Sequence, residues 1–254
     1  MAYRYLFEQM VRRELRQKYR GSALGVLWYL INPLVLMGAY YLMFGVIFDQ
    51  ASEPDYPLFL LVGLVVWVFF NQAVVSAAPS LLDQGALIRK ARFPREIIPA
   101  SVVTVQLVTF LALLALLTPV TIAIRGSIDV ALLLLPLVLT CLFAFVLGFA
   151  LVVSILHAYF RDVAPILSAA LLPWFFVSPI FFRPESITEQ ATARFVLEWV
   201  NPIAPFIGAI RDVIYGGVVP AAPQLAYVAI AAAIALLGGR LLFRRLQGEL
   251  AVVV

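Results

Sequence analysis

Few side chains in this sequence have the types and spacing that catalysis or metal binding requires. The chain has one histidine, His157, and one cysteine, Cys141, which cannot form an intrachain disulfide or supply the several ligands of a metal site. No G-x-S-x-G nucleophile motif and no G-x-x-x-x-G-K-[ST] phosphate loop occur, and the only lysines are Lys18 and Lys90. The sequence therefore predicts a chain that is not an enzyme and holds no cofactor of its own.

The first twenty residues mix cations with apolar side chains at helical intervals. Leu6, Met10, Val11 and Leu15 recur at spacings that place them on one face of a helix, with arginines on the other. This pattern predicts an interfacial amphipathic helix over residues 1–20. The alternative is a topology anchor that contacts only lipid headgroups.

A second cationic segment covers residues 83–96. Apolar Leu87, Ile88 and Phe93 stand among four cations there, although a purely solvated loop needs no apolar residues. A short helix that docks into the groove of a partner uses such apolar anchors with charges around them. The alternative is a simple turn with arginines at the membrane surface.

Aromatic side chains are dense, and the 19 Phe, 10 Tyr and 4 Trp exceed what aromatic belts at the membrane surfaces need. Ring faces stack on sugars and Tyr hydroxyls form hydrogen bonds, so a carbohydrate pathway is one use for them. Packing in the core is the alternative for any single ring. The rings that we assign to a substrate pathway are Trp28, Tyr29, Tyr40, Tyr41, Trp67, Phe70 and Trp174.

Long uncharged stretches must position these residues. Hydrophobic residues make up 64% of the chain and charged residues 13%, which leaves too few polar side chains to cover a water-facing surface. Six stretches reach the ~20 residues that cross a hydrocarbon core. They are Gly21–Phe48, Tyr56–Leu82, Ile97–Ile124, Val130–Phe160, Val163–Phe182 and Val213–Gly239. The sequence predicts an all-α polytopic membrane protein with six transmembrane helices, the fifth kinked by its prolines.

The positions of lysine and arginine predict the orientation. Most of the 18 precede the first stretch, follow the sixth, or lie in the two connections that share their side of the membrane. The first external loop instead carries Asp49, Glu53 and Asp55. The positive-inside rule therefore places both termini in the cytoplasm. Because the cations lie beside hydrophobic stretches, they indicate contact with membrane lipid and no nucleic acid partner.

Between the fifth and sixth stretches, Trp199–Ile210 is uncharged but too short to cross. Pro202, Pro205 and Gly208 interrupt it, which favours a re-entrant segment covered by protein, within an external region of residues 183–220. The alternative is an amphipathic helix on the outer surface.

The six stretches contain no ionisable side chain in their interiors. Ion-coupled carriers keep such groups at membrane depth, because the coupling ion must be bound there. Only neutral polar groups occur, among them Asn32, Asn71 and Gln106. If the chain is a transporter, its energy is expected to come from another subunit.

Three segments together resemble a known family. Val11–Trp28 with Asn32-Pro33-Leu34, then Leu87–Pro99, then Asn201–Gly216 with Asn201-Pro202, Pro205-Phe206 and Arg211-Asp212, are similar to permease subunits of ABC exporters for cell-surface polysaccharide. The resemblance extends over nearly the whole chain.

The resemblance implies a homodimeric permease of the inner membrane that pairs with two copies of an ABC ATPase, which binds ATP and Mg. Its cargo would be a lipid-linked polysaccharide such as O-antigen, capsule or teichoic acid. A drug or small-molecule exporter is the alternative within transport, and a membrane protein acting on lipid-linked sugars without moving them is the alternative outside it.

The resemblance also implies roles for individual segments. The amphipathic helix and the loop after the second span would contact the ATPase, and the segment near Val196–Gly217 would gate the outer side. The residues assigned to ATPase coupling are Arg12, Arg13, Arg16, Leu87, Ile88, Arg89, Lys90, Arg92 and Phe93. Those assigned to the external gate are Asn201, Pro202, Pro205, Phe206 and Arg211.

Overall fold

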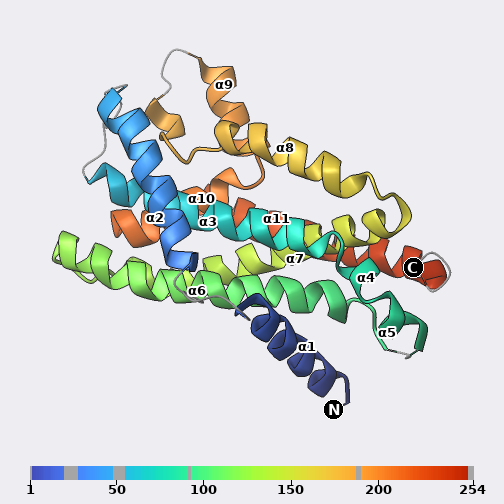
Figure 1. The fold of residues 1–254 in the computed structure, drawn as a ribbon. Helices are drawn as coiled ribbons and strands as arrows, with labels where there is room; N and C mark the ends of the chain where they lie inside the picture. Colours follow the sequence, from blue (N-terminus) through green and yellow to red (C-terminus); the bar gives the residue numbers. More distant parts are fainter. Residues whose placement is uncertain (1, 20–27, 48–54, 91–92, 187–189, 251–254) are drawn as a thin grey trace.

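The computed structural model describes residues 2–19, 28–47, 55–90, 93–186 and 190–250, and every regular element in these ranges is a helix (Figure 1). The predicted all-α class is confirmed for this part of the chain. The α-helices are α1 Ala2–Tyr19, α2 Trp28–Tyr40, α3 Tyr56–Ala77, α4 Ser80–Asp83, α5 Gly85–Lys90, α6 Ile97–Arg125, α7 Leu135–Tyr159, α8 Val163–Val177, α9 Ala191–Phe195, α10 Ala204–Arg211 and α11 Ala222–Leu246. Short 3₁₀-helices cover Val130–Leu134, Pro184–Ser186 and Gln247–Glu249, and π-helices continue α2, α9 and α10 over Tyr41–Ile47, Val196–Val200 and Asp212–Gly216.

Four helices within the described ranges are long and apolar enough to cross a membrane: Tyr56–Ala77, Ile97–Arg125, Val130–Tyr159 and Ala222–Leu246. The first and fifth predicted stretches form shorter apolar helices, Ile31–Ile47 and Val163–Val177. With 15 residues, α8 is about 22 Å long, less than the ~30 Å of a hydrocarbon core. Helix length thus supports four crossings, while crossings by the first and fifth stretches stay predictions.

Proline and glycine set helix ends that hydrophobicity alone did not locate. The fifth stretch stops being helical at Val177, because Ser178 precedes Pro179 and the residue before a proline avoids helical angles. The predicted sixth stretch, 213–239, differs from the observed helix at both ends. Gly217 takes a positive φ of 65° that ends the segment after α10, and α11 begins only at Ala222.

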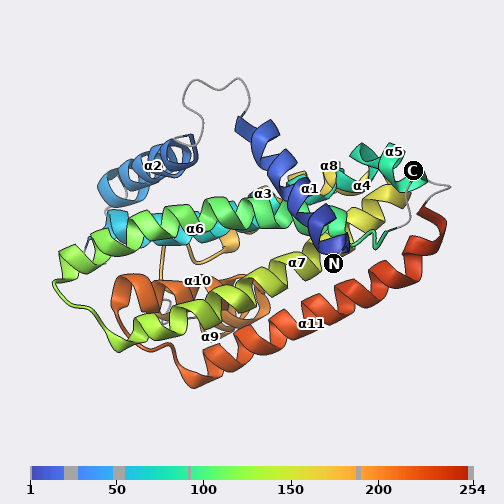
Figure 2. The same cartoon turned by 90° about the horizontal axis from the view of Figure 1, so that it is seen from below.

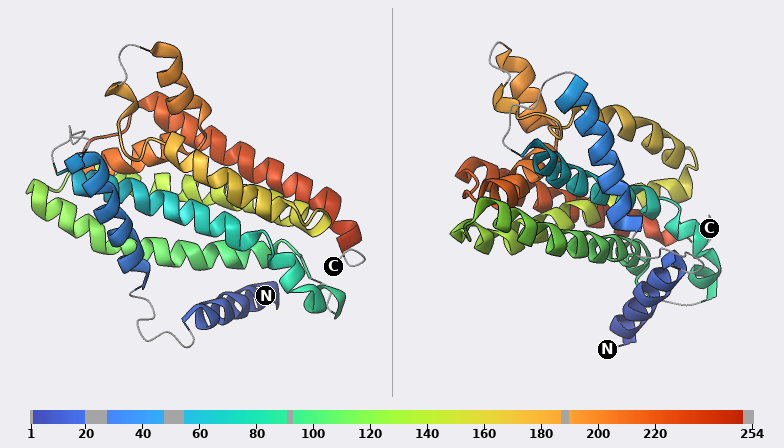
Figure 3. Two further views of the ribbon diagram at one scale, coloured as in Figure 1. Left: turned by 45° about the horizontal axis from the view of Figure 1, so that its top comes forward. Right: turned by 60° about the vertical axis from the view of Figure 1, so that its left-hand side comes forward.

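Helix α3 lies at the centre of the fold, between α2 and α8 on one side and α6 and α7 on the other (Figures 1 and 3). In its most apolar stretch, two thirds of the residues are buried, against less than a third in the corresponding stretch of each of the other three long helices. A helix that is apolar all round is stable where neighbours surround it. The outward apolar surfaces of α6, α7 and α11 fit lipid as their surroundings.

A second, smaller core joins α1, α5 and the end of α11. Met10, Ile88, Ile98 and Phe243 are buried there together. Beside it, the Arg240 and Arg244 guanidinium groups lie 3.1 and 2.9 Å from the Glu96 carboxylate. Helix α11 thus continues through these cations to Leu246, beyond the apolar stretch that the sequence marked.

Among the described residues, the most extensive helix contact is between α7 and α11, which run side by side (Figure 2). A Cβ atom at Gly239 would lie 2.3 Å from the Gly148 carbonyl oxygen, and one at Gly148 would lie 2.2 Å from the Ala235 backbone. Such close approach of backbones is how small residues bring membrane helices together.

Gly239→Ala should therefore destabilise the protein, whereas Gly238→Ala should not. The added methyl at position 239 meets rigid backbone, and overpacking of this kind costs ~1–3 kcal/mol. A Cβ at Gly238 has no atom within 4 Å, so this neighbour is the matched control. Unfolding in detergent micelles measures both variants, and equal stabilities would contradict the contact.

Candidate functional site

The region between α8 and α11 folds as two short helical segments with a break between them. Helix α9 and its π-helical continuation end at Val200, the chain turns at Asn201 and Pro202, and α10 follows. Helix α10 is buried almost throughout, against α3, α7 and α11. Residues 204–211 are thus covered by protein and do not form the surface helix that was the alternative expectation.

Arg211, at the end of α10, carries a charge into the interior. Its side chain is 3% exposed. Its two terminal nitrogens donate hydrogen bonds to the carbonyl oxygens of Pro179 (2.8 Å) and Ile180 (3.0 Å), and its Cζ lies 3.7 Å from the centre of the Phe59 ring. Backbone oxygens and a ring face together offset the cost of removing a guanidinium from water. One side chain therefore joins α10, the segment after α8, and α3.

The segment after α8 receives further hydrogen bonds from both sides. The Asn201 amide nitrogen donates to Ser178 Oγ (3.1 Å), and its amide oxygen accepts from Trp174 Nε1 (2.9 Å). From α3, the Tyr56 hydroxyl donates to the carbonyl oxygen of Phe181 (2.8 Å). Residues 177–181, which we call the outer loop after the side on which the sequence predicts them, are thus bound by the side chains of Arg211 in α10, Asn201 before α10 and Tyr56 in α3.

The close fit around Arg211 extends to Gly63 of α3. A Cβ at Gly63 would lie 2.4 Å from an Arg211 terminal nitrogen, so only glycine leaves room for the guanidinium. Farther out, Arg183 lies 3.9 Å from the Asp212 carboxylate. The sequence assigned Arg211 to an external gate but did not single out Tyr56, Phe59 and Gly63. No residue pattern within an apolar helix shows which distant side chain it will contact.

A cavity of about 440 Å³ lies between α2, α3 and α8. Its polar lining consists of neutral side chains, while Tyr40, Trp67 and Phe175 supply rings. Amides and hydroxyls in such a lining bind hydroxyl-rich ligands, and ring faces bind their apolar faces. The residues that line it are Asn32, Leu36, Tyr40, Leu64, Trp67, Val68, Asn71, Gln72, Val75, Ser168, Leu171, Leu172 and Phe175.

Of the predicted pathway aromatics, the structure brings Tyr40 and Trp67 to this cavity. Phe70 is fully buried beside it, in contact with Trp174, whose ring nitrogen is committed to Asn201. Trp28 and Tyr41 are exposed, and the side chain of Tyr29 lies outside the described part of the chain. Among the predicted gate residues, Asn201, Pro205 and Phe206 are buried and Pro202 is half-buried.

The predicted coupling residues divide into two groups. Ile88 is buried in the core with α1, and Leu87 and Phe93 pack against that core. The cations are exposed instead, so the surface that this chain offers to a partner is mostly charge; Arg92 lies outside the described residues. The exposed cations are Arg12, Arg13, Arg16, Arg89 and Lys90.

Comparison with known proteins identifies the relatives of this chain. The family model described as ABC-2 type transporter matches residues 5–215. The O-antigen export system permease protein RfbA of Myxococcus xanthus is 31% identical over 249 residues, which cover 98% of this chain and 95% of that protein. A protein of the same name from Klebsiella pneumoniae is 29% identical, with 84% and 83% covered. The polysialic acid transport protein KpsM of Escherichia coli is 27% identical, with 93% and 92% covered.

Replacing Arg211 with Met should loosen the outer loop. The change leaves two buried carbonyl oxygens without their donors, and each such acceptor costs ~1–3 kcal/mol. We expect a correspondingly lower free energy of unfolding and faster hydrogen exchange at residues 178–183. Arg194→Met is the control, because Arg194 is partly exposed and pairs with Glu198 one turn away, a contact worth only ~0.3–0.5 kcal/mol. Equal effects of the two changes would contradict the role of Arg211.

Proposed function

This chain belongs to the ABC-2 type transporter family, and we propose that it is the membrane-spanning permease of an ATP-driven exporter of lipid-linked polysaccharide. The observation that carries the proposal is similarity over nearly the whole chain to relatives named for O-antigen and polysialic acid transport. A cavity lined by amides and aromatic rings supports a sugar cargo over an apolar drug, which is the second candidate.

The substrate pathway that we propose begins at the cavity between α2, α3 and α8. Helices α2 and α8 are the short apolar helices, and both carry exposed apolar side chains such as Val35, Ile166 and Leu172. A second copy of the chain placed against these two helices would cover that surface and close the cavity into a channel. The active unit in this proposal is therefore a homodimer in the inner membrane, and each copy crosses the bilayer six times with both termini in the cytoplasm.

Energy enters through a separate subunit in this proposal. An ABC ATPase, with ATP and Mg bound to it, would dock at the end of the molecule where α1, α5 and the C-terminal end of α11 meet. The exposed cations of α1 and α5 give that surface a positive charge, which favours an acidic partner surface. A shift of α1 and α5 would then displace α6 and α11, because all four helices pack into the core that contains Met10 and Ile88.

The outer end would be gated by the segment of α9 and α10, dipping into the membrane as a re-entrant pair. Arg211 would hold this gate closed, because its guanidinium joins α10 to the outer loop and to α3. Opening of this gate would require the Arg211 hydrogen bonds and ring contact to break, so these contacts would stabilise the closed state.

The pathway is tested by filling the cavity. Ser168 of α8 lines the cavity, whereas Leu116 is exposed on α6, away from the two helices proposed to meet the second copy, so Ser168→Trp should block export while Leu116→Trp should not. We expect at least a tenfold loss of surface polysaccharide in cells that depend on the Ser168→Trp variant, with normal amounts of permease and co-purified ATPase subunit. Normal export with Ser168→Trp would place the pathway elsewhere.

The docking surface is tested by reversing its charge. Replacing both Arg89 and Lys90 with Glu turns attraction to an acidic partner surface into repulsion. The loss of each pair of opposite charges across the contact weakens binding by several-fold or more. We expect the ATPase subunit to stop co-purifying with this variant. Arg194→Glu, in α9 at the opposite end of the fold, should still co-purify with the ATPase subunit. Full retention of that subunit by the double variant would remove α5 from the contact.

A further inference from the structure

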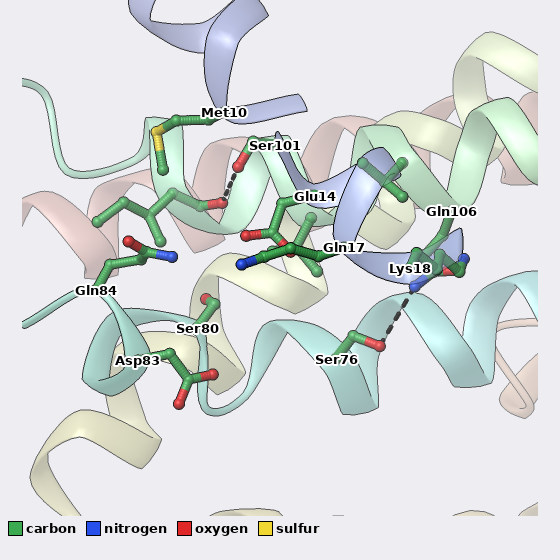
Figure 4. Close-up of a pocket in the computed structure, with 13 residues that line it drawn as sticks. Met10, Glu14, Gln17, Lys18, Ser76, Ser80, Asp83, Gln84, Ser101 and Gln106 are labelled. Carbon is green, nitrogen blue, oxygen red and sulfur yellow. Dashed lines mark hydrogen bonds between the residues drawn. The ribbon is translucent and has the colours of Figure 1, made fainter. Parts of the chain in front are cut away.

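A second polar cavity, of about 370 Å³, lies under α1 (Figure 4). It is bounded by α1, by the end of α3 with α4, and by the first turns of α6. No residue lines both this cavity and the one proposed for the substrate pathway. Its lining consists of Met10, Glu14, Gln17, Lys18, Ser76, Ser80, Asp83, Gln84, Ile98, Ser101, Val102, Val105 and Gln106.

This cavity is at the level where apolar helices give way to charged segments. Ser76 is in the last turn of α3, and Ser101 is near the start of α6, both at the polar ends of candidate spans. The cationic segment 83–96 begins at its edge. A ligand in this place would therefore sit at the depth of lipid headgroups and not in the hydrocarbon core.

One part of the cavity is rich in hydrogen-bond acceptors. The hydroxyls of Ser80 and Ser101 donate to the carbonyl oxygens of Ala77 and Ile98 (2.7 Å each), so their oxygens are left to accept from a ligand. Glu14 points into the same space from α1, and Asp83 adds a carboxylate at the rim (Figure 4). Several acceptors with two carboxylates match a primary ammonium, which has three N–H donors.

The other part carries a cation. Lys18 Nζ donates to Gln106 Oε1 (2.5 Å), and Gln106 Nε2 donates to Ser76 Oγ (3.3 Å), so α1 is tied to α6 and α3. Burial lowers the pKa of Lys18 from 10.5 to about 8. Glu14 and Lys18 are four residues apart on one face of α1, about 6 Å along its axis. The cavity thus presents negative and positive groups side by side.

We propose that this cavity binds the headgroup of a zwitterionic phospholipid with a primary ammonium, the phosphoethanolamine class. Its phosphate contacts Lys18, and its ammonium contacts Glu14, Asp83 and the serine oxygens. With two carboxylates and one ammonium, the charges on the wall sum to −1, which repels the diphosphate of a lipid-linked glycan. A choline headgroup has no N–H to donate and would leave the buried acceptors without hydrogen bonds. The bound lipid then secures α1 against α3 and α6.

The test measures lipid binding by the purified full-length protein. Native mass spectrometry of protein taken from nanodiscs of phosphatidylethanolamine, phosphatidylcholine or phosphatidylglycerol gives the lipid retained per chain. We expect one retained phosphatidylethanolamine, and about tenfold weaker retention of the other two lipids, because neither headgroup carries the N–H donors of a primary ammonium.

Two variants and one control locate the site. Glu14→Gln and Asp83→Asn should each weaken phosphatidylethanolamine retention by about tenfold. Glu8→Gln makes the same change on the same helix, but Glu8 pairs with Arg4 outside the cavity and should retain the lipid fully. Asp83 is exposed, so its variant keeps the test valid if Glu14→Gln does not fold. Equal retention of the three lipids, equal behaviour of Glu14→Gln and Glu8→Gln, or displacement by a polyprenyl diphosphate would each overturn the proposal.

Discussion

The Arg211 guanidinium, held between two backbone carbonyls and the Phe59 ring, is the interaction on which the packing of α10 against α3 and the outer loop depends. Helix α8 ends early, at Val177, because Pro179 follows, so the outer loop has carbonyl groups that no helix satisfies. Inside a membrane protein such groups need internal donors. Arg211 donates to two of these carbonyls and Tyr56 to a third, while Asn201 donates to the Ser178 hydroxyl. Together these bonds fix where α10 lies, and the guanidinium leaves Gly63 no room for a side chain.

This arrangement explains why the two short apolar helices and the buried outer segment occur together. Helix α8 is too short to reach through the hydrocarbon core by itself, and α10 is buried against α3, α7 and α11. The cavity between α2, α3 and α8 then lies inward of the outer loop. In the proposed exporter, the Arg211 contacts close the outer side of a pathway that begins at this cavity, so the same residues serve stability and gating.

At the other end of the molecule, ion pairs and hydrogen bonds between side chains join the helices. Glu96 holds Arg240 and Arg244, and the Lys18–Gln106–Ser76 hydrogen bonds hold α1. A small apolar core between them connects α1 and α5 to the long helices. The helices that would meet an ATPase are therefore packed on the rest of the chain, and the exposed surface that remains is cationic.

The sequence by itself determined the membrane class, the six apolar stretches, the amphipathic character of α1 and the family. Hydrophobicity, charge and motif spacing are properties of residues that lie near one another in the chain, so they do not depend on how the helices pack. It also located the break near Asn201 and assigned Arg211 to the outer side. Only the tertiary structure decided that Arg211 is buried, since its partners Pro179 and Phe59 are distant in sequence. The same holds for the contact of Gly148 with Gly239, the start of α11 at Ala222, and the cavity formed around Glu14 and Lys18. Each depends on which helices pack together, and a single chain's residue pattern does not record that pairing.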